Sequence, residues 1–414
     1  MSYFMEHELL EQVLFARQPI FNRDQQVFAY ELLFRNGEAD KAEFIDGDLA
    51  TRSVLLNAFT QSSSPQVLNG KPGFLNVGSA MISTIPSFAQ QFLVVEILEN
   101  EHNNTGIVDK MRDLRARGFE IALDDFDMKD YRPELIDSAD IIKLDVLAYT
   151  EAALALAVQR LRQHPVRLLA EKVETQAMYQ YTQSLGFDLY QGYFFCRPEL
   201  VKGHILDANR RSLFDLLSAL YQPDVDVPAL AAIVKRDVVL SYKLLKLVNS
   251  SFYRRLKTVD SINHAVMMLG VARIRSWATL VCLGKLGRKP DELQTESLMR
   301  GHMCEYLGQK FDAQTAAMSF SVGLLSCMDA WLDQPLSELM ALLPLSPEFH
   351  EAVVNKEGQA GVLLSIVTLY MHSQWHKLPE AALKDFGLEL LDLSHAYEYA
   401  IAQTDEISIL MIEE

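Results

Sequence analysis

The first half of the chain alternates short β-like runs with amphipathic helical stretches, and the second half does not. Helical segments such as 104–117 and 151–164 separate several of the β-like runs. Alternation repeated this often predicts a parallel sheet, and eight strands with helices outside would close into a TIM-type (β/α)8 barrel. The eight strand candidates are LFARQPIF, VFAYELLFR, GFLNVG, FLVVEIL, FEIALDD, DIIKLD, RLLAEKV and DLYQGYFF.

From about Lys202 the pattern changes to helices. The stretch LAAIVKRDVVLSYKLLKLVNSSFY repeats apolar residues at helical spacing, as at Leu240, Leu244 and Leu247. Strand signals are sparse beyond this point, so the second half is predicted to be an all-α bundle. A length of 414 residues also suits two domains. We expect a barrel over 1–202 and a helical domain over 203–414.

Charge and cysteine content narrow the classes of partner. The chain carries 38 basic and 55 acidic residues, a formal net charge of −17. We expect no nucleic-acid partner, because gripping a phosphate backbone needs many cations. The four cysteines are widely spaced and form no C-x-x-C pair, which is typical of reduced thiols in a cytoplasmic protein. No apolar run is long enough to cross a bilayer, so no membrane insertion is expected.

Polar residues interrupt nearly every predicted strand. In VFAYELLFR, the alternation of side chains places Ala29, Glu31, Leu33 and Arg35 on one face, opposite an aromatic and leucine face. The polar face should therefore point into the barrel, where an unpaired charge is costly. Comparable polar residues in the other strands are Asn76, Glu96, Asp124, Asp125, Lys143, Glu171 and Gln191.

These polar groups predict a metal site. Side chains at strand ends can converge at the C-terminal mouth of a barrel. Carboxylate and amide oxygens are hard ligands that suit Mg²⁺ or Mn²⁺. The adjacent acids Asp124 and Asp125 repel each other unless cations lie between them, and two ions would suit phosphodiester hydrolysis.

A purely structural role is the alternative for each residue taken alone. Asn76 could belong to a hydrogen-bond network, Lys143 to an internal salt bridge, and Glu31 with Arg35 to a private ion pair. Gln191 alone is weak evidence. One polar group per strand makes a shared functional role the better interpretation.

The first half resembles the EAL domain, the cyclic-di-GMP phosphodiesterase barrel of bacteria. The motifs run in family order from about residue 16 to residue 198. They are RQPIF, YELLFR, FLNVGSA, VVEILE, LDDF, ADIIKLD, LLAEKVET and LGFDLYQGYFFCRP. The resemblance implies hydrolysis of cyclic di-GMP to linear pGpG with Mg²⁺ or Mn²⁺, and pairing of barrels into a homodimer.

The resemblance also implies roles for single residues. Glu171 would act as base or ligand, Lys143 would orient the attacking water, and Glu99 would support the loop after Asp125. The implied metal ligands are Glu31, Asn76, Glu96, Asp124 and Asp125. The residues implied to bind or lie near the substrate or the metal-bound water are Gln18, Pro19, Leu33, Arg35 and Gln191.

The sequence departs from the EAL pattern in one loop and at three single positions. The family loop D-D-F-G-T-G here reads DDFDMKD, so that 127–129 lack its glycines, which permit conformations that other residues resist. Lys172 replaces the glycine after the proposed base. Leu32 replaces the alanine of the name motif, and Asn36 replaces a tryptophan.

The second half resembles the HDOD domain, a relative of HD-type phosphohydrolases. The expected His-Asp pair is Cys327-Met328 here, and no adjacent His-Asp pair exists in the chain. His264 and His302 are predicted to be core or surface residues. The resemblance implies a non-catalytic helical module that binds an unknown protein partner.

Three functions follow from these patterns. The first is metal-dependent hydrolysis of cyclic di-GMP, favoured by the full set of ligand-type residues. The second is an inactive barrel that acts as a cyclic-di-GMP receptor or a scaffold, favoured by the altered loop and Lys172. The third is another TIM-barrel metalloenzyme, because acids and a lysine at strand ends also serve enolisation chemistry.

Overall fold

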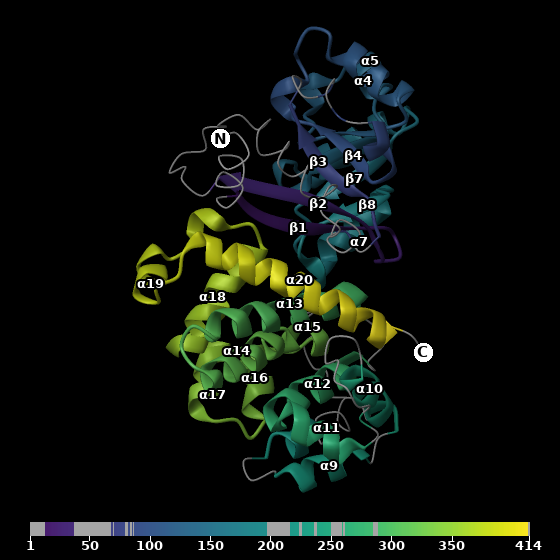
Figure 1. The fold of residues 1–414 in the computed structure, drawn as a ribbon. Helices are drawn as coiled ribbons and strands as arrows, with labels where there is room; N and C mark the ends of the chain where they lie inside the picture. The colour runs from purple at the N-terminus through teal and green to yellow at the C-terminus, as the bar shows by residue number, and fades with distance from the viewer. Residues whose placement is uncertain are drawn as a thin grey trace. The chain divides into compact units, whose positions relative to one another are not determined.

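The computed structural model divides into two compact units, Met1–Phe194 and Phe195–Glu414 (Figure 1). The structure describes residues 13–36, 68, 70–78, 82, 85, 87–196, 216–222, 226–235, 238–249, 259, 261–284 and 289–412.

The first unit is a closed barrel of eight strands in sequence order, which confirms the predicted barrel. Every strand candidate from the sequence contributes a strand. Their bounds are β1 Val13–Phe21, β2 Val27–Asn36, β3 Gly73–Val77, β4 Leu93–Ile97, β5 Glu120–Leu123, β6 Ile141–Asp145, β7 Arg167–Glu171 and β8 Leu189–Gln191.

One strand departs from the all-parallel arrangement expected of a TIM barrel. β1 pairs antiparallel with both β2 and β8, whereas the other neighbours pair parallel. Only residues 22–26 connect β1 to β2. A link this short can make a hairpin, but a parallel crossover needs a dozen or more residues. The direction of β1 therefore follows from the length of its connection.

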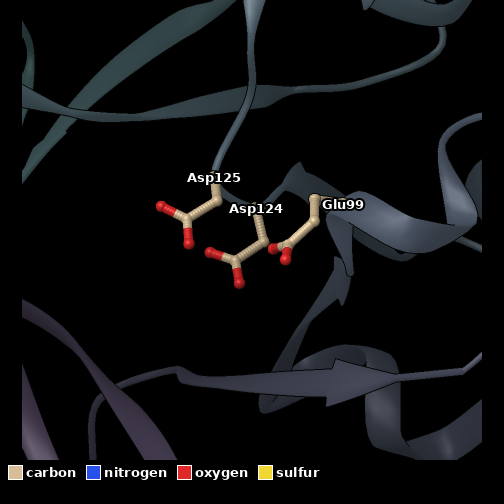
Figure 2. A group of neighbouring side chains, drawn as sticks. All are labelled: Glu99, Asp124 and Asp125. Atoms are coloured by element: carbon tan, nitrogen blue, oxygen red, sulfur yellow. The ribbon is translucent and has the colours of Figure 1, made fainter. Parts of the chain in front are cut away.

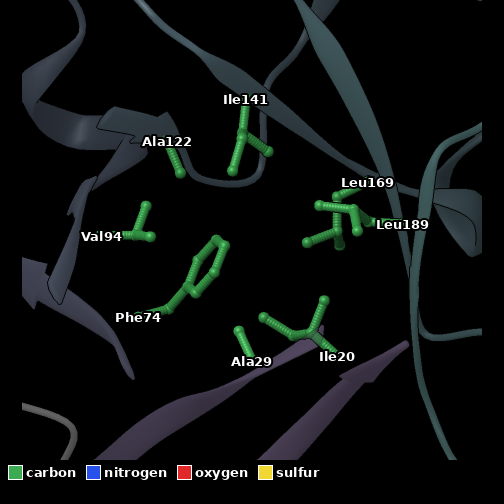
Figure 3. Packing of buried hydrophobic residues seen from close by; sticks show 8 residues of the cluster. All are labelled: Ile20, Ala29, Phe74, Val94, Ala122, Ile141, Leu169 and Leu189. Carbon is green, nitrogen blue, oxygen red and sulfur yellow. The ribbon is translucent and has the colours of Figure 1, made fainter. Parts of the chain in front are cut away.

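An apolar layer fills the barrel interior. It takes one side chain from each strand, and these side chains point toward one another (Figure 3). The layer combines the two small residues Ala29 and Ala122 with the large ring of Phe74 and with aliphatic side chains from the other strands. Close packing of this kind makes the interior a solid core that other side chains can be built upon. The members are Ile20, Ala29, Phe74, Val94, Ala122, Ile141, Leu169 and Leu189.

Helices and 3-10 turns follow the strands. The helices among the described residues are α4 Ile107–Ala116, α5 Pro133–Ile136, α6 Glu151–Leu161 and α7 Gln176–Leu185. The hydroxyls of Thr150 and Thr175 accept hydrogen bonds from the third residue of α6 and α7, respectively. Such N-caps satisfy backbone donors that a helix start leaves free, so the helix boundaries are encoded locally.

The described part of the second unit is helical, as the sequence predicts. The helices are α9 Val227–Lys235, α10 Val238–Val248, α11 Ile262–Leu269, α12 Val271–Gly284, α13 Asp291–Gly308, α14 Ala313–Leu325, α15 Met328–Leu332, α16 Leu336–Ala341, α17 Pro347–Val354, α18 Gly358–Met371, α19 Glu380–Asp385 and α20 Leu390–Ile412.

The central helix α13 packs against α14, α18 and α20 and is buried along most of its length. Its approach to α14 needs glycine. A Cβ on Gly323 would lie 2.5 Å from the backbone oxygen of Arg300. Only a residue without a side chain fits at that crossing.

One helical stretch is longer and more apolar than the sequence analysis allowed. Residues Ala313–Leu332 meet the length and composition of a membrane span, but 78% of that stretch is buried inside the protein. Core helices of globular units pass the same test, because a helix that is apolar all round is a buried one.

Candidate functional site

A polar layer lies directly above the apolar layer of the barrel. Each member stands two residues from an apolar-layer residue of the same strand or its immediate continuation. Successive side chains of a strand alternate between faces, so both layers point inward. The polar layer consists of Gln18, Glu31, Asn76, Glu96, Asp124, Lys143, Glu171 and Gln191.

Lys143 is the centre of the polar layer. Its side chain is fully buried, and its ammonium contacts carboxylates from four different strands or strand ends. The distances from Lys143 Nζ are 2.6 Å to Glu96 Oε1, 2.6 Å to Asp124 Oδ1, 3.0 Å to Glu171 Oε1 and 3.5 Å to Glu31 Oε1. Three of the five predicted metal ligands, Glu31, Glu96 and Asp124, therefore lie together with Glu171 around one ammonium.

One ammonium does not balance four carboxylates, and the pKa values reflect this. Burial raises the pKa of the Glu171 carboxyl to about 8, against the opposing effect of Lys143. Burial likewise holds the pKa of Glu96 well above its usual value. Burial alone would lower the pKa of Lys143, but the surrounding carboxylates outweigh it and hold that pKa well above its ordinary value. The cluster lacks positive charge.

Amide side chains complete the layer. Gln191 Nε2 donates to Glu31 Oε2 and, at 3.1 Å, to Gln18 Oε1. Asn76 Nδ2 donates to Glu31 Oε1 at 3.5 Å. Their donors thus face the Glu31 carboxylate, which fixes its orientation, while their own oxygens stay available.

The layer fits a divalent cation. Several of its buried oxygens have no hydrogen-bond partner among the described residues: Asn76 Oδ1, Glu96 Oε2, Glu171 Oε2 and Gln191 Oε1. Unpartnered buried acceptors are costly. Because they are hard oxygen ligands beside a shortage of positive charge, a divalent cation would satisfy both needs.

A second group of carboxylates borders the polar layer. Glu99, Asp124 and Asp125 bring ligand oxygens within 4.8 Å of one another (Figure 2). Asp124 lies between the other two and also contacts Lys143, so the two groups share it. Burial raises the pKa of Asp125, and Lys172 opposes that rise. We call these three residues the outer carboxylate group.

The altered loop after Asp125 folds without glycine. Residues Met128–Asp130 form a 3-10 turn, and Asp127 caps it through its side chain at a φ of −95°, which any residue adopts. Asn103 Nδ2 donates to Asp130 Oδ1 at 3.2 Å. His102 also contacts the loop, with its Nδ1 3.9 Å from Asp130 Oδ2, whereas Glu99 lies with the outer carboxylate group. The loop keeps a defined shape although 127–129 lack the family glycines.

Lys172 contacts Asp145, a residue to which the sequence patterns assign no role. Lys172 has a φ of 57°, a left-handed conformation in which glycine is usual. Its Nζ lies 2.5 Å from Asp145 Oδ2 and 3.9 Å from Asp125 Oδ1. Asp145 stands two residues after Lys143 on β6, and that spacing was the one signal that could have indicated it.

The residues implied to bind or lie near the substrate are on β1 and β2, apart from Gln191 on β8. Pro19 is buried and Leu33 is half-buried. Arg35 belongs to β2 and its backbone pairs with Leu14, but its side chain lies outside the described residues, as does that of Asn36. Leu32, which replaces the family alanine, is buried in the barrel wall.

The comparisons with known proteins agree on one family. An EAL domain model matches residues 70–198, and an HDOD domain model matches residues 209–332. The uncharacterized protein YuxH of Bacillus subtilis is 33% identical over 397 residues, which cover 93% of this chain and 96% of YuxH. The cyclic di-GMP phosphodiesterase CdgJ of Vibrio cholerae is 31% identical over 387 residues, 91% of this chain and 89% of CdgJ. The chain belongs to the EAL–HDOD family.

A solved structure is similar to part of this chain. The BlrP1 protein of Klebsiella pneumoniae, in a complex with manganese and cyclic di-GMP, is 22% identical. The match covers 44% of this EAL–HDOD chain and 55% of BlrP1, with a TM-score of 0.37.

The helical unit of this EAL–HDOD protein shows no metal centre among its described residues. Cys327 and Met328, at the expected His-Asp position, are buried apolar residues at the start of α15. His264 is exposed on α11. His302 is buried on α13, where its Nδ1 lies 3.5 Å from Glu305 Oε2. Both histidines thus occupy the kinds of position that the sequence predicts.

Proposed function

We propose that this EAL–HDOD protein hydrolyses cyclic di-GMP to linear pGpG with Mg²⁺ or Mn²⁺. The observation that supports this most is the polar layer, in which four carboxylates around Lys143 leave buried oxygens unpartnered at the barrel mouth. The 31% identity to a named cyclic di-GMP phosphodiesterase supports the same substrate. Acids and amides in this arrangement are suited to phosphodiester chemistry.

The ligands in this proposal come from both carboxylate groups. A bound divalent cation would polarise a phosphate oxygen and lower the pKa of a bound water. The residues that would hold it are Glu31, Asn76, Glu96, Asp124 and Asp125.

Glu171 is the proposed base. Burial raises its pKa to about 8 in the metal-free fold. Once a bound cation has displaced that proton, the Glu171 carboxylate would be poised to accept a proton from water. Water would lose a proton to Glu171 as its oxygen bonds to phosphorus. The bond from phosphorus to the 3′ oxygen would break, and that oxygen would take up a proton from solvent to become the 3′-hydroxyl of pGpG. Lys143, 3.0 Å from Glu171 Oε1, would hold the water and compensate charge on the phosphate.

Substrate binding is assigned to residues of β1, β2 and β8. Arg35 would pair with a phosphate, as a guanidinium does well. Gln18 and Gln191, already joined by a hydrogen bond, would orient the ligand edge nearest the polar layer. Pro19 and Leu33 would supply apolar contact. Glu99 would act through the outer carboxylate group.

The proposal also covers the two domains, the location of the protein and its assembly. We assign residues 1–202 to the EAL barrel and 203–414 to the HDOD domain, which would bind a protein partner and regulate the barrel. The protein would act in the cytoplasm without inserting into a membrane, and its barrels would pair in a homodimer.

A second candidate function is a receptor or scaffold without catalysis. The observation that favours it is Lys172, whose ammonium is tied to Asp145 at 2.5 Å and lies beside Asp125. A fixed cation there could exclude a metal ion while leaving nucleotide binding intact.

Incubation of the full-length protein with cyclic di-GMP and Mn²⁺ separates the two functions. We expect pGpG from the wild type and none from Glu31→Ala, with Glu31→Gln as the isosteric variant. Catalysis is refuted if the wild type forms no more pGpG than Glu31→Ala at high protein concentration. Metal-independent binding of cyclic di-GMP by calorimetry would then establish the receptor, and no binding would leave the scaffold.

A further inference from the structure

Lys172 occupies a backbone conformation that lysine adopts at a cost. It directly follows Glu171 at the end of β7 and has a φ of 57°, where an L side chain crowds its own backbone. The next residue fixes this turn, because Val173 N donates to Gln191 O at 2.9 Å. Glycine would fit the turn without that cost. A strained residue at a strand end suggests that its side chain has a task.

The ammonium of Lys172 is held in place from one side. Its Nζ lies 2.5 Å from Asp145 Oδ2, while Asp145 Oδ1 accepts a hydrogen bond of 2.8 Å from Leu147 N. The lysine carbon chain is half-exposed, so this carboxylate sets the direction of its charged end. Lys172 is therefore a positioned charge and not a freely moving surface lysine.

The positioned charge faces the outer carboxylate group. Lys172 Nζ is 3.9 Å from Asp125 Oδ1. Asp125 also has a left-handed backbone, with a φ of 39°, so two unusual backbone positions bring these side chains together. A cation bound by Asp125 would meet this ammonium at short range, where like charges repel strongly. It would also compete with the ammonium for the Asp125 oxygen.

We propose that Lys172 weakens the binding of a divalent cation at the outer carboxylate group. The effect would be specific to the outer carboxylate group, because Lys172 lies beside Asp125, whereas Lys143 contacts Glu96 in the polar layer. The protein would then fill its second cation position only at high metal concentration. This inference rests on the proposed function, since it concerns the metal site of the hydrolase.

Three variants isolate the charge from the backbone. Lys172→Gly removes the ammonium and relaxes the left-handed turn, so it is expected to fold. Lys172→Arg keeps a positive charge at the same position. Gln25→Gly is the matched control, because Gln25 has a φ of 58° in the turn before β2, at the end of the barrel opposite the carboxylates.

Titration of the metal-free full-length proteins with Mn²⁺, followed by the electron paramagnetic resonance of the free ion, measures the affinities directly. We expect Lys172→Gly to bind its weaker class of ions about 10- to 100-fold more tightly than the wild type. Lys172→Arg and Gln25→Gly should follow the wild-type curve.

The outcomes separate this inference from the proposed function. If the wild type binds Mn²⁺ and forms pGpG but Lys172→Gly titrates as the wild type does, the inference alone is overturned. Tighter binding by Gln25→Gly as well would overturn it too, because backbone relaxation would then explain the gain. If neither the wild type nor Lys172→Gly binds Mn²⁺ and no pGpG forms, both fail together.

Discussion

Replacing Lys143 by methionine removes the charge at the centre of the polar layer while keeping most of the side-chain volume. Lys143 is fully buried and contacts four carboxylates at 2.6–3.5 Å. Removing one partner of a buried ion pair leaves uncompensated charge and costs about 3–5 kcal/mol. For a unit of this size about 1 kcal/mol shifts Tm by roughly 2–4 °C, so the barrel should melt roughly 6–20 °C lower.

The loss of stability caused by Lys143→Met should depend on pH and on the presence of metal. Without the ammonium the carboxylates can recover stability only by taking up protons, so the loss at about pH 8 should exceed the loss at about pH 5.5. Mn²⁺ supplies the missing charge. At a concentration of about 100 times its Kd it should restore about 2.7 kcal/mol.

Calorimetry in chelator and in Mn²⁺ measures these shifts. All three tryptophans, Trp277, Trp331 and Trp375, lie in the helical unit, so their fluorescence identifies the transition that belongs to that unit. Lys129→Met is the matched control, because Lys129 is exposed and its ion pair among the described residues is with its near neighbour Asp127. Equal melting of Lys143→Met and Lys129→Met in chelator at about pH 8, or no recovery with Mn²⁺, would refute the reasoning.

Two further predictions concern pH and helix packing. Because the pKa of Glu171 is about 8 in the fold and ordinarily 4.5, the folded state binds the extra proton between these values. The metal-free protein should therefore lose stability as pH rises from about 5 to about 8, and Mn²⁺ affinity should fall as pH is lowered through that window, by up to about tenfold per pH unit. Calorimetric titration checks this, and Glu171→Gln should show a flatter dependence. Gly323→Ala should destabilise the helical unit by about 1–3 kcal/mol or more, because its Cβ would lie 2.5 Å from the Arg300 backbone oxygen. Chemical unfolding followed by tryptophan fluorescence measures this, and an unchanged midpoint would contradict the close helix crossing.

Local patterns in the sequence predict most of the barrel. Each of the eight strands is a short apolar run, and an alternation of two fixes which residues share a face. That alternation predicts that Ala29 and Glu31 point the same way, and both lie inside the barrel. The helical second half follows equally from its 3.6-residue period. These features depend on neighbouring residues only.

The arrangement around the site depends on contacts between distant strands. The sequence gives Lys143 and Glu171 as polar residues in separate strands, and only the register of the closed barrel brings them to 3.0 Å. The contact of Lys172 with Asp145 arises in the same way, across the β6–β7 pair. Neither contact can be predicted from the residues that adjoin it in the sequence.

The chain by itself therefore determined which side chains would face inward and which chemistry they could perform. The tertiary structure alone decided that one ammonium would serve four carboxylates and that Lys172 would lie beside Asp125. Hydrophobic periodicity is a property of adjacent residues, whereas distances between strands are set by ring closure and register, which involve the whole barrel at once.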